Sequence, residues 1–490
     1  MVDLTAVLLA LLVAFIVGQY VKLQSRRGQF PPGPTPLPII GNLWNLRFEL
    51  RHETLMQLAK TYGNVFTVWM GQTPMIVLNG CQTIRDALIT HSEETIGRPT
   101  TPLIERFSGG KGVIFSSGHT WKQQRRFGLM TLRNLGLGKK SLERRIQNEA
   151  QHLVEFFALE NGKALDPSHT IVHSVTNVIT SIVFGYRFTR EDKVFDQLTE
   201  ANDFMTQFMG SMWARLFDAF PWLVERIPGP LQHFFRHHNF IKEFVKREIG
   251  NHKENGIPEE PEDFIDYYLA QIDKVSDDGS STFDELNMIH LVVELFGAGV
   301  ETTTTTLRWA LLYMITQPVI QEKVQKELDA VLGDSQIIQY EDRKRLPYTN
   351  AVIHEVQRYS NMQSVGAFRQ TVKETSLQGF NIKKGTIIIP NLSSSLLDPD
   401  HWEKPSEFNP GHFLDKEGNF KTNEAFLPFS AGHRVCLGEL LARTELFIFF
   451  SSLMRAFTFR LPDGVKEVNM GHILGSTLVP YPYTICAIPR

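Results

Sequence analysis

The segment Phe429-Ser430-Ala431-Gly432-His433-Arg434-Val435-Cys436-Leu437-Gly438 is the most informative part of this chain. Residues 439–457 follow it with apolar residues at helical spacing, so the segment is expected to be a glycine-containing loop that brings Cys436 to the start of a helix. Backbone N–H groups and the dipole at a helix N-terminus favour an anion. We therefore expect Cys436 to have a depressed pKa and to persist as a thiolate, the form of cysteine that binds a metal.

The neighbours of Cys436 favour a bound cofactor. Arg434 adds a positive charge suited to a carboxylate of such a cofactor, and Gly432 and Gly438 let the backbone approach a flat ligand closely. For a lone cysteine, a buried structural role before an amphipathic helix is the commoner alternative. The ten-residue pattern as a whole favours the metal ligand.

Composition excludes several other classes of protein. The chain has 490 residues, of which 42% are hydrophobic and 21% charged, and its formal net charge is -3. These values fit an ordinary globular protein and give no sign of nucleic-acid binding. Only three cysteines occur, Cys81, Cys436 and Cys486, which argues against a disulfide framework, and no cysteine or histidine pair has the spacing of a zinc finger.

The N-terminus has the pattern of a membrane anchor. Residues 4–17 are apolar except for one threonine, and the run continues weakly to residue 21, which is just long enough to span a bilayer. Asp3 precedes it, and Lys22, Arg26 and Arg27 follow it. Cations on that side place the body of the protein in the cytosol. A cleaved signal peptide is the alternative, but a basic segment before the apolar run and a clear cleavage site are both missing.

We therefore expect three parts: a transmembrane anchor over residues 1–21, a basic and proline-rich linker over 22–40, and a catalytic domain over 41–490. Five prolines between positions 31 and 38 favour a stiff, extended linker. In the domain, residues 65–69 and 75–78 predict a hairpin, and residues 386–390 predict another strand. Most of 120–360 has helical periodicity, so the expected fold class is mainly α with small β-sheets.

Residues 284–317 predict one long helix with an unusual centre, Gly297-Ala298-Gly299-Val300-Glu301-Thr302-Thr303. Glycines and threonines are poor helix formers, and threonine hydroxyls compete for backbone carbonyls and can open a helix locally. A groove there would leave room for dioxygen, and Glu301 with Thr302 could relay protons to it. Close packing of small residues against a neighbouring helix is the alternative.

These motifs resemble those of the cytochrome P-450 superfamily. Residues 429–438 look like its haem-binding loop, Phe-x-x-Gly-x-Arg-x-Cys-x-Gly, and residues 298–303 look like its oxygen-activation motif. The resemblance extends from the anchor to the C-terminus and is greatest to the microsomal family two, in particular to the vertebrate branch that epoxidises and hydroxylates arachidonate (J-type). It implies the cytochrome P-450 fold, haem b (iron protoporphyrin IX) as cofactor, and Cys436 as the ligand of the iron.

The resemblance also implies roles for residues outside the loop. Trp121, Arg125, Arg98, Arg369 and Arg434 are expected to contact the haem propionates. Glu355 and Arg358 lie at i, i+3 on a predicted helix over 348–359, where they can pair, and are expected to form a buried latch on the cysteine loop. His412 stands where the third member of the latch is usually arginine. Phe368 stands where relatives often have proline, which suggests a different pocket shape.

The implied reaction inserts one oxygen atom of O₂ into a lipophilic substrate, such as arachidonate, linoleate or a xenobiotic, by epoxidation or hydroxylation. Thr302 and Glu301 are the expected catalytic residues. The expected pocket wall consists of Phe107, Phe115, Phe204, Phe208, Ala298, Val365 and Thr477. The preferred substrate and the position of attack do not follow from the sequence.

Electrons are expected from a separate protein, NADPH-cytochrome P-450 reductase, with cytochrome b5 as a second candidate partner, because the chain has no dinucleotide-binding fingerprint. A basic face for an acidic partner is predicted at Lys122, Arg126, Arg133, Lys139, Lys140 and Arg443. The expected location is the endoplasmic reticulum membrane, with one span and the catalytic domain in the cytosol. Residues 217–222 are predicted to dip into the bilayer.

Two other functions remain as alternatives. One is an oxygen-independent isomerase of lipid hydroperoxides on the same scaffold, although such relatives often lack the acid–threonine pair that Glu301 and Thr302 supply. The other is a non-enzymatic haem carrier or sensor, although carriers usually use histidine as the iron ligand.

Overall fold

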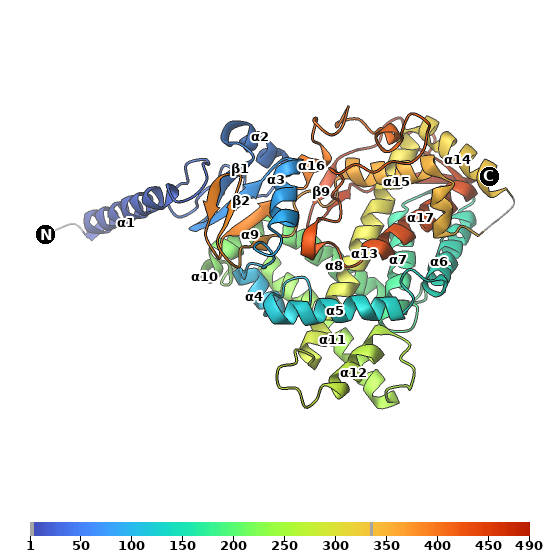
Figure 1. Cartoon of the computed structure of the whole chain (residues 1–490), viewed down its shortest axis with the longest axis horizontal. Coiled ribbons are helices and arrows are strands. Elements are labelled where there is room, and N and C mark those ends of the chain that lie inside the picture. The colour runs from blue at the N-terminus through green and yellow to red at the C-terminus, as the bar shows by residue number, and fades with distance from the viewer. Residues whose placement is uncertain (1–3, 334–336) are drawn as a thin grey trace.

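The computed structural model describes residues 4–333 and 337–490, so the first three residues of the predicted anchor, including Asp3, lie outside it. One helix, α13 (Glu285–Thr316), runs through the middle of the molecule and packs against α7 (Ser168–Val183) and α17 (Glu439–Ala456) (Figure 1). Most of α13 is buried because it is apolar around most of its circumference. Its bounds agree with the helix predicted over 284–317.

The other helices surround α13 (Figure 1). Those of the first half are α2 (His52–Tyr62), α3 (Cys81–Arg85), η1 (Asp86–Thr90), α4 (Pro102–Ser108), α5 (Gly118–Asn134), α6 (Lys140–Leu159), α8 (Lys193–Gly210), α9 (Met212–Ala219), α10 (Pro221–Val224), α11 (Pro230–Asn255) and α12 (Phe264–Lys274). Those of the second half are α14 (Pro318–Leu332), η2 (Tyr340–Lys344), α15 (Pro347–Ser360), α16 (Ser393–Leu396), η3 (Pro410–Phe413) and η4 (Gly432–Arg434).

The strands form small sheets, as predicted. The largest has the order β1-β2-β7-β4, in which β1 (Val65–Met70) and β2 (Thr73–Leu78) are the predicted antiparallel hairpin and β7 (Ile387–Pro390) is the other predicted strand. The remaining strands are β3 (Ala164–Leu165), β4 (Arg369–Gln370), β5 (Thr375–Leu377), β6 (Phe380–Ile382), β8 (Phe457–Arg460), β9 (His472–Leu474), β10 (Leu478–Pro480) and β11 (Ile485–Pro489).

The apolar N-terminal segment continues as a helix beyond its predicted end at residue 21. Helix α1 (Leu4–Arg27) is exposed over almost its whole length and, among the described residues, is the helix long and apolar enough to cross a membrane. The predicted linker is also not separate from the domain but is hydrogen-bonded to it. Arg26 donates a hydrogen bond to the carbonyl of Gln72, and Arg27 donates one to that of Gly33. The prolines lie against β1, where Thr67 donates to the carbonyls of Pro31 and Pro32.

The turn between β9 and β10 enters the molecule beside α8 and α13 and brings chain segments far apart in sequence to one place. Ser476 donates its backbone N–H to the carbonyl of Thr206, and Trp309 donates its indole N–H to that of Leu478. Gly210 and Gly475 pack so closely that a Cβ on Gly210 would lie 2.2 Å from the carbonyl oxygen of Gly475. The absence of side chains at both positions is therefore what lets α8 and the turn meet.

Candidate active site

The cysteine loop is a compact turn that ends in α17, as its sequence predicts. The backbone N–H of Cys436 donates to the carbonyl of Phe429 at 3.0 Å, and Gly432, at φ 71°, packs against the carbonyl of Leu88, where any side chain would clash. The accessible surface of Cys436 faces a cavity of about 320 Å³ with mostly apolar walls. Ala298, Gly299 and Thr302 of α13 form the wall opposite the loop.

The prediction that Cys436 has a depressed pKa is wrong for the protein chain without a bound metal ion. Burial raises this pKa; the backbone N–H of Gly438 and the charge of Arg125 act in the opposite direction, and Glu439 adds to the rise. The helix begins only at Glu439, three residues after the cysteine, and its favourable dipole is outweighed by the loss of hydration. A metal ion at the sulfur, which would itself stabilise the thiolate, is therefore needed to keep Cys436 ionised near neutral pH.

Four arginines surround the same cavity, as the resemblance implied: Arg98, Arg125, Arg369 and Arg434. Arg434 donates to the carbonyls of Ile96, Val113 and Ser116, and its guanidinium lies 4.1 Å from the centre of the Trp121 ring. Arg125 donates to the carbonyl of Val435 at 2.7 Å, and Arg369 donates to the hydroxyl of Ser430 at 3.2 Å. Neutral oxygens thus take the place of counter-ions within the described residues.

Burial and mutual repulsion make this cluster electrostatically unfavourable. Burial lowers the pKa of Arg434 to about 8 and that of Arg98 to about 10, and the neighbouring arginines contribute to both shifts. The pKa of Arg369 is also lowered well below its ordinary value by burial and by the other three arginines. Glu294 is the carboxylate that acts on Arg98 and Arg434, and its own carboxylate already accepts the backbone N–H groups of Val113 and Ile114.

These features fit a flat cofactor with two carboxylates. The indole Nε1 of Trp121 and the Nε of Arg369 are buried without a hydrogen-bond partner in the described part of the chain, and buried donors of this kind are rare in finished structures. Two propionates at the arginine cluster would supply both the missing acceptors and the missing negative charge. The apolar walls on either side suit a porphyrin, and Cys436 is the available axial ligand.

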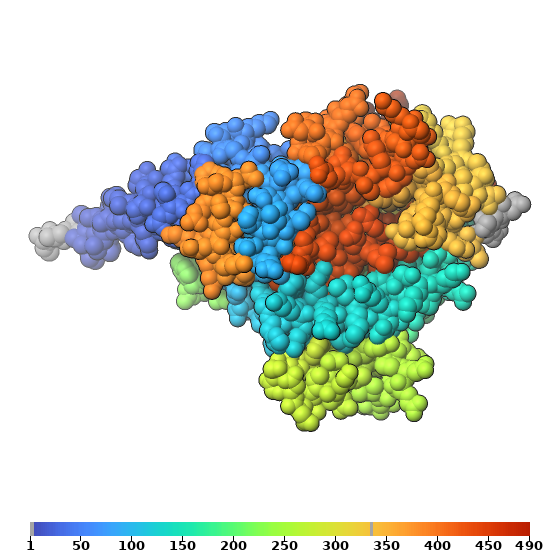
Figure 2. All heavy atoms as spheres, viewed as in Figure 1, coloured from blue at the N-terminus to red at the C-terminus, as the bar shows by residue number. Residues whose placement is uncertain are grey.

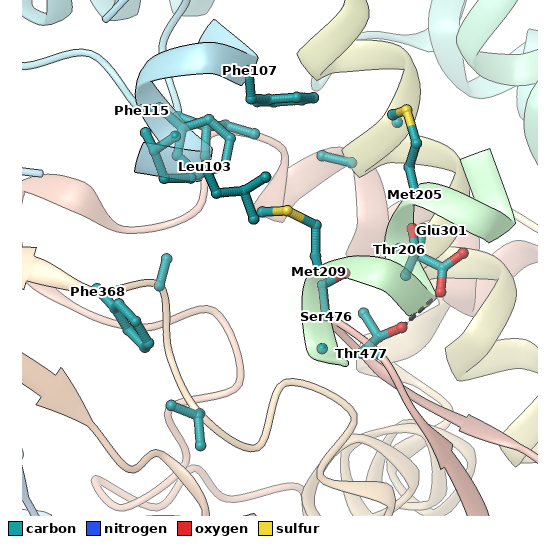
Figure 3. A pocket seen from close by; sticks show the side chains of 18 of the residues that line it. Leu103, Phe107, Phe115, Met205, Thr206, Met209, Glu301, Phe368, Ser476 and Thr477 are labelled. Atoms are coloured by element: carbon teal, nitrogen blue, oxygen red, sulfur yellow. Dashed lines mark hydrogen bonds between the residues drawn. The ribbon is translucent and has the colours of Figure 1, made fainter. Parts of the chain in front are cut away.

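A second cavity, of about 360 Å³, joins the first where Ala298 and Thr302 form part of both walls. Phe107, Phe115, Val365 and Thr477, all predicted for the pocket, line it. The rings of Phe107 and Phe115 meet edge to face, with centroids 5.6 Å apart. Figure 3 shows these two rings with Leu103 on one side of the space, and Met205, Glu301 and Thr477 on the other.

Two predicted pocket residues do not line this cavity. Phe208 is buried behind Phe234, with ring centroids 4.6 Å apart, and Phe204 packs against His237 of α11 at 4.9 Å. Helix α8 instead turns another face inward. The residues of that face are Asn202, Met205, Thr206, Met209 and Gly210.

The two expected catalytic residues lie next to each other in α13 but have different hydrogen-bond partners. Thr302 donates its hydroxyl to the carbonyl of Ala298 at 2.9 Å, so it competes for the helix backbone as predicted. Glu301 is buried and accepts a hydrogen bond from the hydroxyl of Thr477 at 2.6 Å (Figure 3). Burial raises the pKa of Glu301 to about 7, against the opposing effect of Thr477.

The three residues predicted for the latch lie together, and their recorded contacts are with residues 396–412, which precede the cysteine loop. Glu355 and Arg358 have no exposed side-chain surface and share two hydrogen bonds of 2.7 Å. Arg358 also donates to the carbonyls of Leu396, Pro405 and Glu407, while Nδ1 of His412 lies 3.2 Å from both carboxylate oxygens of Glu355. The histidine therefore occupies the third position, and it leaves its own Nε2 buried without a partner in the described residues.

Five of the six cations predicted for the basic face are exposed on α5 and at the beginning of α6: Lys122, Arg126, Arg133, Lys139 and Lys140. Figure 2 shows α5 and α6 crossing the same face of the molecule as the segment that contains the cysteine loop and α17. Arg443 differs from the prediction, because it is half-buried, pairs with Glu439 at 2.9 Å and contacts His354. The basic face therefore consists of the five exposed residues.

One buried acid in the cofactor cavity could not be predicted from a sequence pattern. Glu445 of α17 accepts a hydrogen bond from Thr303 of α13 at 3.0 Å, and its other carboxylate oxygen is buried without a partner in the described residues. Burial raises the pKa of Glu445 to about 8, so the side chain is mainly neutral at pH 7. Only the packing of α17 against α13 brings these two residues together.

Fold and site together define a haem-thiolate protein, and comparison with known proteins agrees. Residues 31–487 match the family described as Cytochrome P450, and the chain belongs to that family. It is 46% identical to Cytochrome P450 2J2 of Homo sapiens over 479 residues, which cover 98% of this chain and 95% of the relative. It is 45% identical to Cytochrome P450 2J5 of Mus musculus over 470 residues, covering 96% and 93%.

A third relative, Cytochrome P450 2C25 of Mesocricetus auratus, is 40% identical over 488 residues, covering 99% of this chain and all of the relative. The predicted family, fold class and cofactor are thereby confirmed. The protein is a monooxygenase of lipophilic substrates that holds haem b, and its family-two relatives are microsomal proteins of the endoplasmic reticulum. When bound, the haem activates dioxygen for insertion into the substrate.

Proposed function

We propose that this protein oxygenates unsaturated fatty acids such as arachidonate and linoleate, by epoxidation or hydroxylation, and accepts xenobiotics of similar shape. The observation that carries the proposal is the junction of the two cavities at Ala298 and Thr302. An apolar chain in the cavity of Phe107 and Phe115 can reach this junction, where the cofactor cavity begins. The walls shield the chain from water, which protects the reaction from side products.

The site residues have distinct roles in this proposal. Cys436 ligates the iron, while Trp121, Arg98, Arg125, Arg369 and Arg434 hold the propionates. Thr302 orients a proton donor at the junction of the cavities, and Glu301, with a pKa near the working pH, supplies protons there. Glu355, Arg358 and His412 keep the segment before the cysteine loop in place. Phe107, Phe115, Ala298, Val365 and Thr477 shape the substrate cavity.

We further propose that electrons come from NADPH through NADPH-cytochrome P-450 reductase, with cytochrome b5 as an additional donor, and that an acidic surface of the reductase docks on the basic face. In the net reaction, the substrate, O₂, two electrons and two protons give the oxygenated product and water. Replacing Arg126 and Arg133 by glutamate should lower the rate of reduction by the reductase about tenfold at low salt, and less at high salt. Arg443→Gln serves as the comparison, because Arg443 is paired with Glu439 and is not part of the exposed basic face.

The deciding experiment supplies reductase, NADPH, linoleate and ¹⁸O₂ and analyses the products by mass spectrometry. A monooxygenase incorporates one labelled atom per product, and only when NADPH is present. An isomerase of lipid hydroperoxides would instead convert a hydroperoxide without NADPH and without label, and a haem carrier would give no product. Either of these two results would contradict the proposal.

The proposed location is the endoplasmic reticulum membrane, with α1 as the single span and the catalytic domain in the cytosol. Beside α1, the protein exposes Trp222, which is 61% accessible, and Leu223, which is 43% accessible, in and next to the predicted membrane-dipping segment. Phe217, by contrast, is buried. Replacing Trp222 and Leu223 by serine in a variant without residues 1–27 should reduce its partitioning onto vesicles. Unchanged partitioning would contradict this second contact.

A further inference from the structure

The substrate cavity contains a cation, Arg215 of α9, whose hydrogen-bonding groups are mostly unused. Within the described residues its hydrogen-bond partner is the carbonyl of Met209, which accepts from Nη2 at 2.6 Å. The Nε of Arg215 is buried and has no partner there. A guanidinium has five N–H donors, and a buried unpaired donor costs about 1–3 kcal/mol. Arg215 is therefore placed for an acceptor that the described residues do not provide.

The neighbouring acid makes no direct hydrogen bond to this cation in the described structure. Asp218 lies one helical turn beyond Arg215 and also lines the cavity, but it forms no ion pair with Arg215 in the described structure. Its carboxylate accepts the backbone N–H of Leu103 at 2.9 Å and the hydroxyl of Thr101. Burial lowers the pKa of Arg215 and raises that of Asp218, and the attraction between the two charges opposes both shifts. Because Asp218 uses its oxygens on Leu103 and Thr101, the hydrogen-bond donors of Arg215 remain available to a second carboxylate.

Other charged groups in the cavity wall already have partners. Arg98 donates to the carbonyls of Ile114, Ala367 and Phe368, so few of its donors remain. Glu294 accepts two backbone N–H groups, and Glu301 accepts the hydroxyl of Thr477. Among the described residues Arg215, with one recorded acceptor, has more unused donors than Arg98, with three.

The position of Arg215 suits the end of a long molecule. Its guanidinium lies 5.8 Å from the centre of the Phe368 ring, and Figure 3 shows Phe368 on the side of the cavity opposite Glu301. Glu301 is adjacent in α13 to Thr302, at the junction with the cofactor cavity. Between the two ends the wall is mainly apolar, with Leu103, Phe115 and Val365 among its residues.

We propose that Arg215 binds the carboxylate of an amphipathic lipid substrate, so that the acid end lies at α9 and the hydrocarbon chain extends to Ala298 and Thr302. Arginine suits this task because its planar guanidinium can hold a carboxylate with two parallel hydrogen bonds. This inference rests on the proposed oxygenation of fatty acids and adds the residue that selects the head group and sets which carbon reaches the junction.

The test measures binding and product pattern separately. Linoleate and its methyl ester are titrated into the full-length, haem-loaded protein, and binding is followed by the change in haem absorbance. Arg215→Gln should raise the Kd of linoleate about tenfold and leave that of the ester within about twofold. Arg215→Lys should restore most of the preference for the acid. Arg236→Gln, on the exposed surface of α11, is the matched control and should change neither Kd.

The same variants are then assayed with reductase and NADPH. Arg215→Gln should broaden the distribution of oxygenated carbons, because the chain loses its fixed end. If wild-type protein binds acid and ester equally, or if Arg215→Gln weakens both to the same extent, the inference is wrong and Arg215 has a structural role. A chain that binds the acid selectively but makes no oxygenated product would instead overturn the proposed function and leave carboxylate binding intact.

Discussion

Glu301 accepts a hydrogen bond from the hydroxyl of Thr477 at 2.6 Å, whereas Thr302, its neighbour in α13, donates to the carbonyl of Ala298. The acid is thus positioned by a turn 176 residues away in sequence. Because Thr477 stabilises the charged form of the carboxyl, it opposes the rise in pKa that burial causes. The two residues together determine the pH range in which Glu301 holds a proton.

The pH dependence of turnover should respond to Thr477. In Thr477→Val the hydrogen bond to the carboxylate is lost, so the pKa of Glu301 should rise further above about 7 and the side chain should remain protonated to higher pH. The inflection in the pH profile of kcat should move upward by about one unit. Ser476→Ala, a change in the same turn, should leave it in place. An inflection that also stays in place in Thr477→Val would show that Glu301 is not the titrating group.

Cys436→Ser should abolish the long-wavelength absorption band of the reduced carbonyl complex, because only thiolate ligation produces this band. Cys486→Ser and Cys81→Ser provide matched controls, since both cysteines are buried away from the cavity. Difference spectra of the three variants give the answer directly. Persistence of the band in Cys436→Ser would mean that another residue ligates the iron.

Removing the acid of the latch should be strongly destabilising. Glu355→Ala leaves the guanidinium of Arg358 fully buried without its counter-charge, which should lower the free energy of unfolding by about 3–5 kcal/mol. Chemical denaturation measures this loss. As a control, Glu322→Ala breaks the exposed pair with Lys326 and should leave the stability nearly unchanged. Equal losses in the two variants would contradict a structural role for the latch.

Glu445 should make stability depend on pH. Because burial raises its pKa to about 8, the folded state binds its proton more tightly than the unfolded state does. Stability from this group is complete below the ordinary carboxyl pKa of about 4.5 and is lost as the pH rises towards 8. Glu445→Gln should therefore reduce the loss of stability between pH 5 and pH 8 by on the order of 2 kcal/mol.

Thermal unfolding of the haem-loaded variants at several pH values tests this sign. Glu322→Gln, at an exposed carboxyl of α14, is the control and should leave the pH dependence unchanged. A Glu445→Gln protein whose Tm falls with rising pH as steeply as that of the wild type would contradict the assignment.

The contact between Gly210 and Gly475 can be tested with a pair of equivalent substitutions. In Gly210→Ala the new Cβ would lie 2.2 Å from the carbonyl oxygen of Gly475, so α8 and the β9–β10 turn must separate, at a cost of about 1–3 kcal/mol. Gly250→Ala in α11 adds the same methyl group where no atom lies within 4 Å, and should be neutral or stabilising by up to about 1 kcal/mol. If Gly210→Ala is as well tolerated, the close packing has no energetic significance.

Local sequence patterns predicted the parts of the site that depend on spacing along the chain. The loop before α17 and the pair of Glu355 and Arg358 follow from residues close together in sequence, and the structure has them as expected, whereas α13 stays a continuous helix through the centre that was predicted to open. Patterns of this kind are sufficient because helix geometry fixes which neighbours meet.

Features that depend on packing between distant segments could not be predicted in this way. Helix α8 carries apolar side chains on two faces, so the sequence could not decide whether Phe204 and Phe208 or Met205 and Met209 face the cavity. The pKa of Cys436 was predicted in the wrong direction because the helix dipole is visible in the sequence, whereas the burial that outweighs it is not. Arg215 has no distinctive sequence neighbours at all.

Helix α1 ends on the body of the protein and not on a hinge, since Arg26 and Arg27 donate to the carbonyls of Gln72 and Gly33. Because of these hydrogen bonds, a rotation or a displacement of α1 is passed on to the catalytic domain. If α1 spans a bilayer, its tilt sets the angle at which the whole catalytic body stands on the lipid surface, and with it the depth of α10, which lies on the same side of the molecule (Figure 1). A change in bilayer thickness would then alter the orientation of the whole catalytic body by purely mechanical means.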